Sequence, residues 1–180
     1  MSNVTALSPA TVSLERLLEA KERRAARQQA LLAQHHVPLV SLTLVTPGPV
    51  KDSPLYRRAM EEAVTAFDAL SREQSWPVAE HQLHWQATGA EGFWAVDGDA
   101  LAIKRAAVTL EDSHPLGRLW DFDVFCPRSG ALNRSRLERA GRSCLLCDEP
   151  AHVCARSRRH PLPVVIARIE ERLNAYFPAG

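Results

Sequence analysis

Two aspartates lie two residues apart in a short run of alternating residue types, Trp120-Asp121-Phe122-Asp123-Val124. In an extended strand, residues i and i+2 share a face, so both carboxylates would project from one side with apolar side chains buried behind them. Two like charges held this close raise each other's pKa unless a cation lies between them. Proteins often hold Mg²⁺ with one or two carboxylates and substrate phosphates. The pattern predicts a Mg²⁺ site, although so short a motif also fits an edge strand whose acidic residues only face water.

The residues just before this strand favour chemistry on phosphates. Gly117 permits the close approach of a ligand, and Arg118 carries a planar donor group that matches phosphate oxygens. Carboxylates that bind a metal beside such a cation are typical of phosphoryl and nucleotidyl transfer. Arg118 could equally neutralise one of the aspartates in a structural ion pair. Glu111 and His114 are candidate general bases, and either could instead only hold the turn.

A second segment suited to phosphate binding lies nearer the N-terminus. The run of β-branched residues in 37–45 predicts a buried strand, and Pro-Gly-Pro around Gly48 ends it. Lys51 follows, and Ser53 with Pro54 predicts the start of a helix. A strand, a glycine-containing loop, a lysine and a helix N-terminus favour phosphate binding. The glycine spacing of a Walker loop is absent, so the signal is weak by itself.

A third cluster contains cysteines and histidines, within residues 142–160. Cys144 and Cys147 have the spacing that lets two thiolates bind one Zn²⁺, and Cys154 and His160 could complete a tetrahedral set. The spacing from Cys154 to His160 is looser than in ordinary zinc fingers. The alternative is a segment whose reduced thiols simply pack inside the protein.

The elements that must position these residues mix helices and strands. Apolar periodicity predicts helices over 14–35, 54–72, 101–110 and 163–177, and strands over 37–45, 78–88, 92–96 and 120–125. Residues 131–143 are basic and predict a loop with a short turn. We expect a single domain over 1–180, with residues 1–12 as a loose tail and 142–160 as a Cys/His-rich segment within it. The predicted class is α/β (α+β), a mixed sheet flanked by helices.

Composition narrows the function classes. The chain has 180 residues, 46% of them hydrophobic and 24% charged, with a formal net charge of +1. Such a charge does not mark a nucleic-acid binder, and no apolar run is long enough to span a membrane. The N-terminal residues lack the basic-then-apolar pattern of a signal peptide, and the chain has four cysteines. We therefore expect a reducing compartment, the cytoplasm.

Three segments together resemble one protein family. VPLVSLTLVTPGPVKDS (37–53), EDSHPLGRLWDFDV (111–124) and RSCLLCDEPAHVCARSRRH (142–160) are similar to the holo-citrate lyase synthases, also called apo-citrate lyase phosphoribosyl-dephospho-CoA transferases. The similarity begins at ERRAARQ, near Arg23, and extends to His160. It implies a transferase that takes triphosphoribosyl-dephospho-CoA and attaches phosphoribosyl-dephospho-CoA to a serine. That serine belongs to the acyl carrier (gamma) subunit of citrate lyase, and pyrophosphate is released.

The resemblance also suggests roles for the residues. Asp121 and Asp123 would hold Mg²⁺ against the triphosphate, while Arg118, Lys51 and Arg27 would neutralise its oxygens. A nucleotidyltransferase-like fold would need a third acidic residue on another strand. Glu80, Glu91 and Asp97 are the candidates, and the sequence does not choose among them.

Three alternatives belong to other classes. One is a zinc-dependent nucleic-acid-binding module, based on the Cys/His cluster and its basic neighbours. Another is a glycosyltransferase that binds a sugar nucleotide through its D-x-D motif and Mn²⁺. The last is an adaptor that binds the carrier without catalysis. The first would bind DNA or RNA, and the second would cleave a nucleotide sugar without a carrier. The third would leave the carrier unmodified.

Overall fold

A computed structural model describes residues 10–178, and residues 1–9 and 179–180 lie outside the description. The elements are α1 (Leu14–His35), β1 (Leu39–Leu44), α2 (Pro54–Glu73), β2 (Val78–His84), β3 (Glu91–Val96), α3 (Ala100–Ser113), β4 (Trp120–Cys126), β5 (Gly130–Leu132), α4 (Ala151–Ser157) and α5 (Leu162–Tyr176), with 3₁₀ turns η1 (Gly117–Leu119) and η2 (Arg134–Leu137). Most of the expected N-terminal tail falls outside the described residues. Val12 is buried, and its N–H donates to the Pro49 carbonyl at 2.8 Å.

The strands form one sheet in the order β2-β3-β1-β4-β5, antiparallel at every pairing. The α+β class is confirmed, but the expected mixed sheet is wrong. Two strand–helix–strand units, β1-α2-β2 and β3-α3-β4, supply four of the strands, and neither unit places its two strands side by side. In the structure another strand separates the two strands of each unit: β3 lies between β2 and β1, and β1 lies between β3 and β4.

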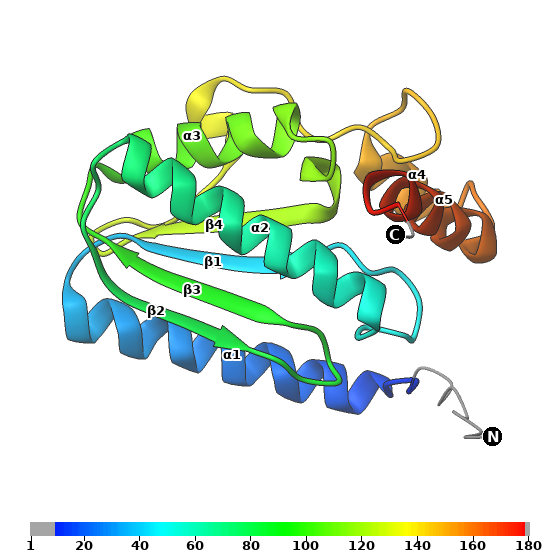
Figure 1. Cartoon of the computed structure of the whole chain (residues 1–180), viewed down its shortest axis with the longest axis horizontal. Helices are drawn as coiled ribbons and strands as arrows, with labels where there is room; N and C mark the ends of the chain where they lie inside the picture. Colours follow the sequence, from blue (N-terminus) through cyan, green and yellow to red (C-terminus); the bar gives the residue numbers. More distant parts are fainter. Residues whose placement is uncertain (1–9, 179–180) are drawn as a thin grey trace.

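The two faces of the sheet are covered differently (Figure 1). One face packs against α2 and α3 through large buried side chains of the central strands, including Trp94 and Phe122. The other face meets α1 in a smaller apolar cluster of Leu31, Leu39 and Phe93. The face under α1 therefore leaves room for polar side chains of β1, β3 and β4.

Local sequence explains the helix starts. The side chains of Ser13, Ser53 and Asp99 cap α1, α2 and α3, accepting backbone N–H groups at 3.3, 3.1 and 2.9 Å. The predicted bounds of these helices are confirmed within a few residues. Strand β5 was not predicted, because three residues are too short to show strand periodicity.

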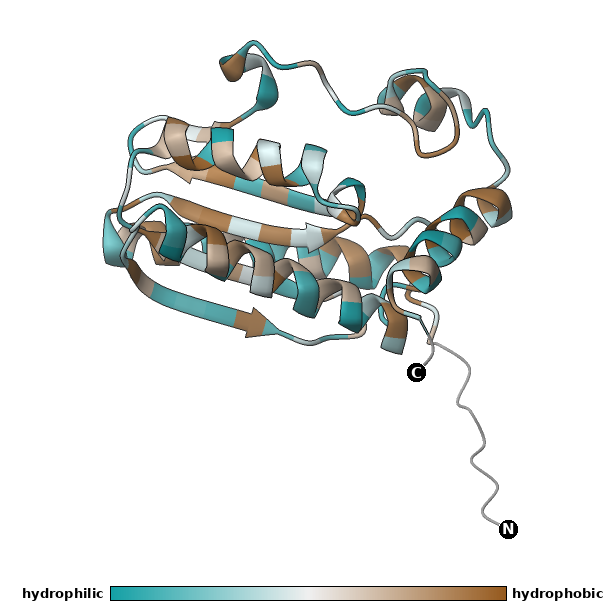
Figure 2. Cartoon of the chain, turned by 45° about the horizontal axis from the view of Figure 1, so that its top comes forward, coloured by the Kyte–Doolittle hydropathy of each residue, from teal (hydrophilic) through white to brown (hydrophobic). Residues whose placement is uncertain are grey.

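Strand β2 is an edge strand of the sheet, and two helices lie beyond one end of the sheet (Figure 1). Strand β2 forms an outer edge and is mostly hydrophilic (Figure 2), as suits a strand without a further neighbour. Helices α4 and α5 lie together beyond one end of the sheet (Figure 1). Within residues 10–178, every helix is too short or too polar to cross a membrane.

Candidate active site

Asp121 and Asp123 project from the face of the sheet that α1 covers. In the pairing of β4 with β1, Asp121 is opposite Thr43 and Asp123 is opposite Ser41. Phe122, between them, is buried on the other face. Strand alternation therefore brings the two carboxylates together beside the polar side chains of β1.

The outer edge of β4 is closed by side chains at this point. Strand β5 pairs only with Val124, Phe125 and Cys126, so Phe122 has no strand partner on that side. Glu111 Oε2 instead accepts the Phe122 N–H at 2.8 Å, and Lys104 Nζ donates to the Phe122 carbonyl at 2.9 Å. Both side chains are buried. They fix the backbone between the two aspartates and leave no unpaired polar group there.

Electrostatics at the aspartate pair favour a bound cation. Burial among protein atoms, and then the charge of Asp121, raise the pKa of Asp123 to about 6, against the opposing charges of Lys104 and Arg24. The Asp123 side chain still has surface in contact with solvent, so a ligand can reach it. Ionising both carboxylates is costly without a counter-charge, and a divalent cation would remove that cost.

Helix α1 contributes Arg27, which was predicted from the sequence, and also Arg24 and Gln28, which were not. Arg24 donates to Glu91 Oε2 at 2.8 Å, Arg27 lies 3.4 Å from Glu91 Oε1, and Gln28 donates to Ser41 Oγ at 3.0 Å. All of them come from the ERRAARQ segment, which carried the start of the family resemblance. A run of charges on a helix usually faces solvent, but the side chains of Arg24, Arg27 and Gln28 are half-buried against the sheet.

The three candidate third acids occupy different places. Glu91 is buried at the start of β3, on the face under α1, but β1 separates it from the aspartates. Glu80 pairs with His35 at 3.0 Å near the C-terminal end of α1. Asp97 is exposed after β3. Of the three, Glu91 forms an ion pair with Arg24, and the charge of Arg24 also acts on Asp123.

A small cavity of about 230 Å³ lies between α1 and the ends of β1 and β3; we call it the Lys51 cavity. Its lining includes Lys51, Arg24 and Thr43, and Thr43 is the strand partner of Asp121. The Lys51 ammonium donates to the Thr46 carbonyl, and burial lowers the pKa of this lysine. The cavity therefore gathers three cations, Lys21, Arg24 and Lys51, next to the strand partner of Asp121, although neither aspartate lines it.

Other predicted residues lie away from the aspartates. The His114 ring packs on Trp120 at 4.3 Å between centroids, on the opposite face of the sheet, and burial lowers its pKa. Gly48 has a φ of +85° and lies against α5, where an added Cβ would be 3.1 Å from Ile166. Gly117 makes a close approach to protein backbone: an added Cβ would lie 2.2 Å from the Glu111 carbonyl oxygen.

Arg118 also points away from the aspartates. Its Nε donates to the Ser143 carbonyl at 2.9 Å, so it joins the turn before β4 to the Cys/His-rich segment. Burial, and then the charges of Arg142 and Arg172, lower the pKa of Arg118 to about 10.

The Cys/His-rich segment gathers four potential metal ligands. The ligand atoms of Cys144, Cys147, Cys154 and His160 all lie within 4.8 Å of one another. The His160 Nε2 atom is buried without a hydrogen-bond partner, and the Leu146 N–H donates to Cys144 Sγ at 3.4 Å. Three thiols and one imidazole, whose buried Nε2 has no hydrogen-bond partner, fit a structural Zn²⁺ site.

Comparisons with known proteins agree with one another. The family model described as apo-citrate lyase phosphoribosyl-dephospho-CoA transferase matches residues 12–176. Proteins of that name from Escherichia coli O1:K1 / APEC and O139:H28 (strain E24377A / ETEC) are each 45% identical over 163 residues, covering 91% of this chain and 89% of the relative. A third, from Escherichia coli O7:K1 (strain IAI39 / ExPEC), is 44% identical over the same length.

Proposed function

Since the chain belongs to the apo-citrate lyase phosphoribosyl-dephospho-CoA transferase family, we propose that Asp121 and Asp123 form the catalytic centre of this transfer. The protein is an enzyme that transfers phosphoribosyl-dephospho-CoA to apo-citrate lyase. In our proposal the donor is triphosphoribosyl-dephospho-CoA, and the acceptor is a serine of the acyl carrier (gamma) subunit. The single observation that carries the assignment is the carboxylate pair on one face of the sheet, where Thr43, the strand partner of Asp121, lines a cavity that holds three cations.

The proposed reaction is a displacement at phosphorus. The serine oxygen attacks the phosphorus bonded to the ribose oxygen, and a new phosphodiester bond forms. The bond from that phosphorus to the oxygen bridging the next phosphate breaks, and pyrophosphate leaves with the electron pair. The hydroxyl proton passes to solvent or to a phosphate oxygen.

Charge neutralisation is the main task of the residues around the aspartates. Asp121 and Asp123 would hold Mg²⁺, and their shared face and the raised pKa of Asp123 fit such an ion. When bound, Mg²⁺ would neutralise charge on the phosphoryl oxygens. Lys51 and Arg24, in the Lys51 cavity, are placed to bind the leaving phosphates. Arg27 contacts Glu91 and would orient that carboxylate.

We assign Glu111 a positioning role. One of its oxygens accepts the Phe122 N–H, and the other is 2.7 Å from Arg134 Nη2, so neither is free to accept a proton from substrate. His114 lies on the far face of the sheet and accepts the Leu116 N–H through Nδ1. These contacts support roles in the fold for both.

We also propose that Cys144, Cys147, Cys154 and His160 bind a structural Zn²⁺. The ion would tie the loop before α4 to that helix and so hold Ser143, whose carbonyl accepts from Arg118. Thiolate ligands must stay reduced, which fits a cytoplasmic location.

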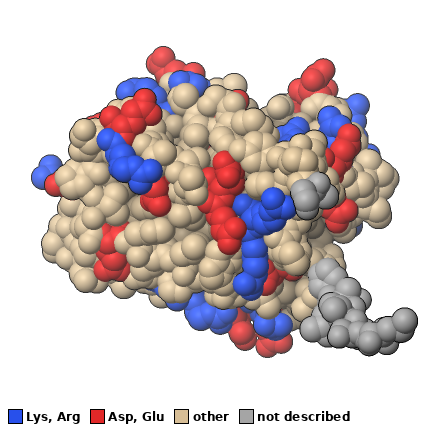
Figure 3. Space-filling view, in the orientation of Figure 1, with Lys and Arg blue, Asp and Glu red and all other residues tan. Residues whose placement is uncertain are grey.

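Mass spectrometry of the carrier tests the proposed reaction. Purified apo-carrier incubated with the protein, Mg²⁺ and triphosphoribosyl-dephospho-CoA should gain the mass of phosphoribosyl-dephospho-CoA on one serine. An unmodified carrier would contradict the proposal. Charge on the face shown in Figure 3 gives no support to the nucleic-acid alternative, since basic and acidic side chains are interspersed there.

A further inference from the structure

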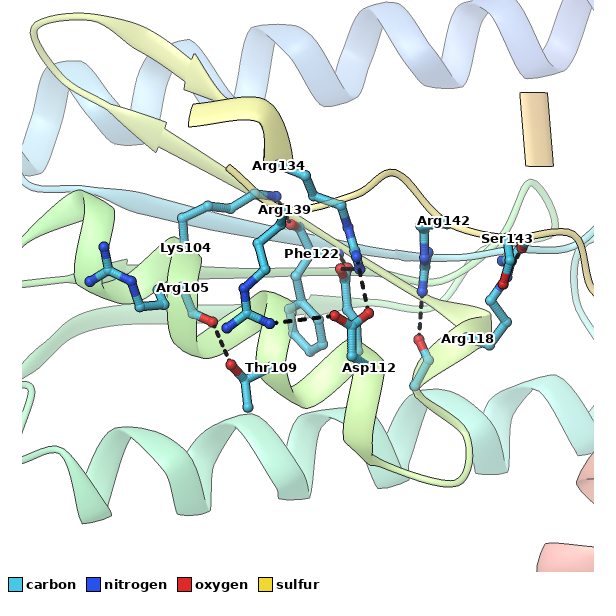
Figure 4. Close-up of polar contacts among 12 residues, drawn as sticks. Lys104, Arg105, Thr109, Asp112, Arg118, Phe122, Arg134, Arg139, Arg142 and Ser143 are labelled. Atoms are coloured by element: carbon cyan, nitrogen blue, oxygen red, sulfur yellow. Dashed lines mark hydrogen bonds and ion pairs between the residues drawn. The ribbon is translucent and has the colours of Figure 1, made fainter. Parts of the chain in front are cut away.

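A basic pocket of about 480 Å³ lies at the outer edge of β4; we call it the arginine pocket. Five arginines line it: Arg118, Arg134, Arg139, Arg142 and Arg172. Its two carboxylates, Glu111 and Asp112, are already engaged, because both lie within 3.0 Å of Arg134 (Figure 4). Within residues 10–178, no carboxylate comes within ion-pair distance of the other three buried or half-buried guanidiniums, those of Arg118, Arg142 and Arg172.

The fold holds these three cations together in spite of their repulsion. Arg118 donates to the Ser143 carbonyl at 2.9 Å, and Arg142 donates to the Gly117 carbonyl at 2.6 Å (Figure 4). Arg142 and Arg172 both lower the pKa of Arg118. Guanidiniums fixed by neutral carbonyls in a partly buried pocket keep donors and charge available for an anion. Phosphate oxygens match that geometry best.

An apolar groove of about 740 Å³ adjoins the pocket. The two share Arg118 and Arg142, and the groove continues along apolar side chains of the Cys/His-rich segment and α5, including Leu145, Leu162 and Val165. Leu162 is 43% exposed. A ligand that fills both spaces must therefore carry phosphates at one part and a less polar chain at another.

We propose that the arginine pocket and the apolar groove bind the dephospho-CoA part of the substrate. This inference rests on the proposed function. Dephospho-CoA has a diphosphate between adenosine and a long pantetheine arm, so it offers the charge and the apolar length that the two spaces require. The diphosphate lies against Arg118, Arg142 and Arg172, and the pantetheine arm lies in the groove.

The position of the pocket suits this assignment. Glu111 lines the pocket and also accepts the N–H of Phe122, the residue between the two aspartates. A ligand held at the arginines can therefore present its phosphoribosyl end around the edge of β4 to Asp121 and Asp123. The Lys51 cavity lies on the β1 side of the aspartates, at Thr43, and it remains available for the leaving phosphates.

Calorimetric titration of the full chain with two ligands tests the proposal. Dephospho-CoA carries the diphosphate and the pantetheine arm, whereas ADP carries a diphosphate without the arm. Arg172→Met should weaken binding of both about tenfold, because a charge-assisted hydrogen bond is lost. Leu162→Gln should weaken binding of dephospho-CoA several-fold and leave ADP unchanged.

Helix α5 supplies matched controls for both changes. Arg168 and Val164 are exposed on the same helix and line neither space. Arg168→Met and Val164→Gln should leave both affinities unchanged. Equal affinity for dephospho-CoA in wild type and Arg172→Met would overturn the proposal. The proposal would also fail if Arg172→Met lost affinity for inorganic triphosphate or for the carrier while its affinity for dephospho-CoA stayed unchanged. Carrier modification by wild type, measured separately, tells failure of this assignment from failure of the proposed function.

Discussion

Glu111 accepts the backbone N–H of Phe122 at 2.8 Å, and Phe122 is the residue between the two aspartates. The second oxygen of the same carboxylate lies 2.7 Å from Arg134 Nη2. One buried side chain therefore connects α3, the edge of β4 and the arginine pocket. Its contacts explain how a strand edge without a neighbour can still hold the side chains of Asp121 and Asp123 in place.

Substitutions of Glu111 should separate positioning from proton transfer. Glu111→Gln keeps an oxygen for the Phe122 N–H, so we expect kcat to fall less than about tenfold. Glu111→Ala leaves the buried Phe122 N–H without a partner and Arg134 paired only with Asp112, so we expect it to lower the free energy of unfolding by about 2–3 kcal/mol. Urea unfolding and steady-state kinetics measure the two effects. If Glu111→Gln folds normally and loses hundredfold or more in kcat, the carboxylate acts as a base.

The raised pKa of Asp123 gives stability a defined pH dependence. The carboxyl has its ordinary value of 3.8 in the unfolded chain and a pKa of about 6 in the folded one. Between these values the folded state binds more protons, so this group's contribution to stability is present below pH 3.8 and lost as the pH rises to 6. At pH 7.5 without Mg²⁺, Asp123→Asn should therefore melt at or above the wild-type temperature.

The same pKa predicts how Mg²⁺ acts on stability. Mg²⁺ needs the ionised pair, so it should raise the wild-type Tm more at pH 7.5 than at pH 5 and leave Asp123→Asn unchanged. Thermal melts at the two pH values measure this. A Tm of Asp123→Asn well below wild type at pH 7.5 would mean that the ionised carboxylate stabilises the fold, contrary to our account.

Gly117 should be required for packing of backbone against backbone. A Cβ at this position would lie 2.2 Å from the Glu111 carbonyl oxygen and 2.7 Å from that of Leu110. Gly117→Ala should lower the free energy of unfolding by about 1–3 kcal/mol through this overlap. Gly141→Ala is the control, since a Cβ there meets no atom within 4 Å. Equal unfolding midpoints for the two variants would show that the turn relaxes freely.

Metal content tests the cysteine cluster. We expect about one zinc per chain by elemental analysis, and Cys147→Ser should lose the metal and lower the Tm. Cys126 is the remaining cysteine and lies outside the cluster, so Cys126→Ser should keep the zinc and the wild-type Tm. Wild-type protein that contains no zinc after purification with added Zn²⁺, and whose Tm does not respond to the ion, would rule the site out.

The sequence predicted what short-range patterns determine. The Ser53-Pro54 start of α2 and the alternation around Asp121 depend on neighbouring residues, and the structure has both. The links between distant segments were not predictable. Arg24 meets Glu91 across 67 positions, and no local pattern announces that pairing. The order of the strands is likewise a long-range property, which is why a mixed sheet was expected and an antiparallel one formed.

Transfer activity of the two aspartate variants tests the central claim most directly. Rates of carrier modification should be measured by mass spectrometry for wild type, Asp121→Asn, Asp123→Asn and, as a control on an exposed acid, Asp97→Asn. We predict that each active-site change lowers the rate at least about hundredfold with the fold intact, because the cation loses a ligand, and that Asp97→Asn stays near wild type. Near wild-type transfer by Asp121→Asn or Asp123→Asn in saturating Mg²⁺ would contradict the account.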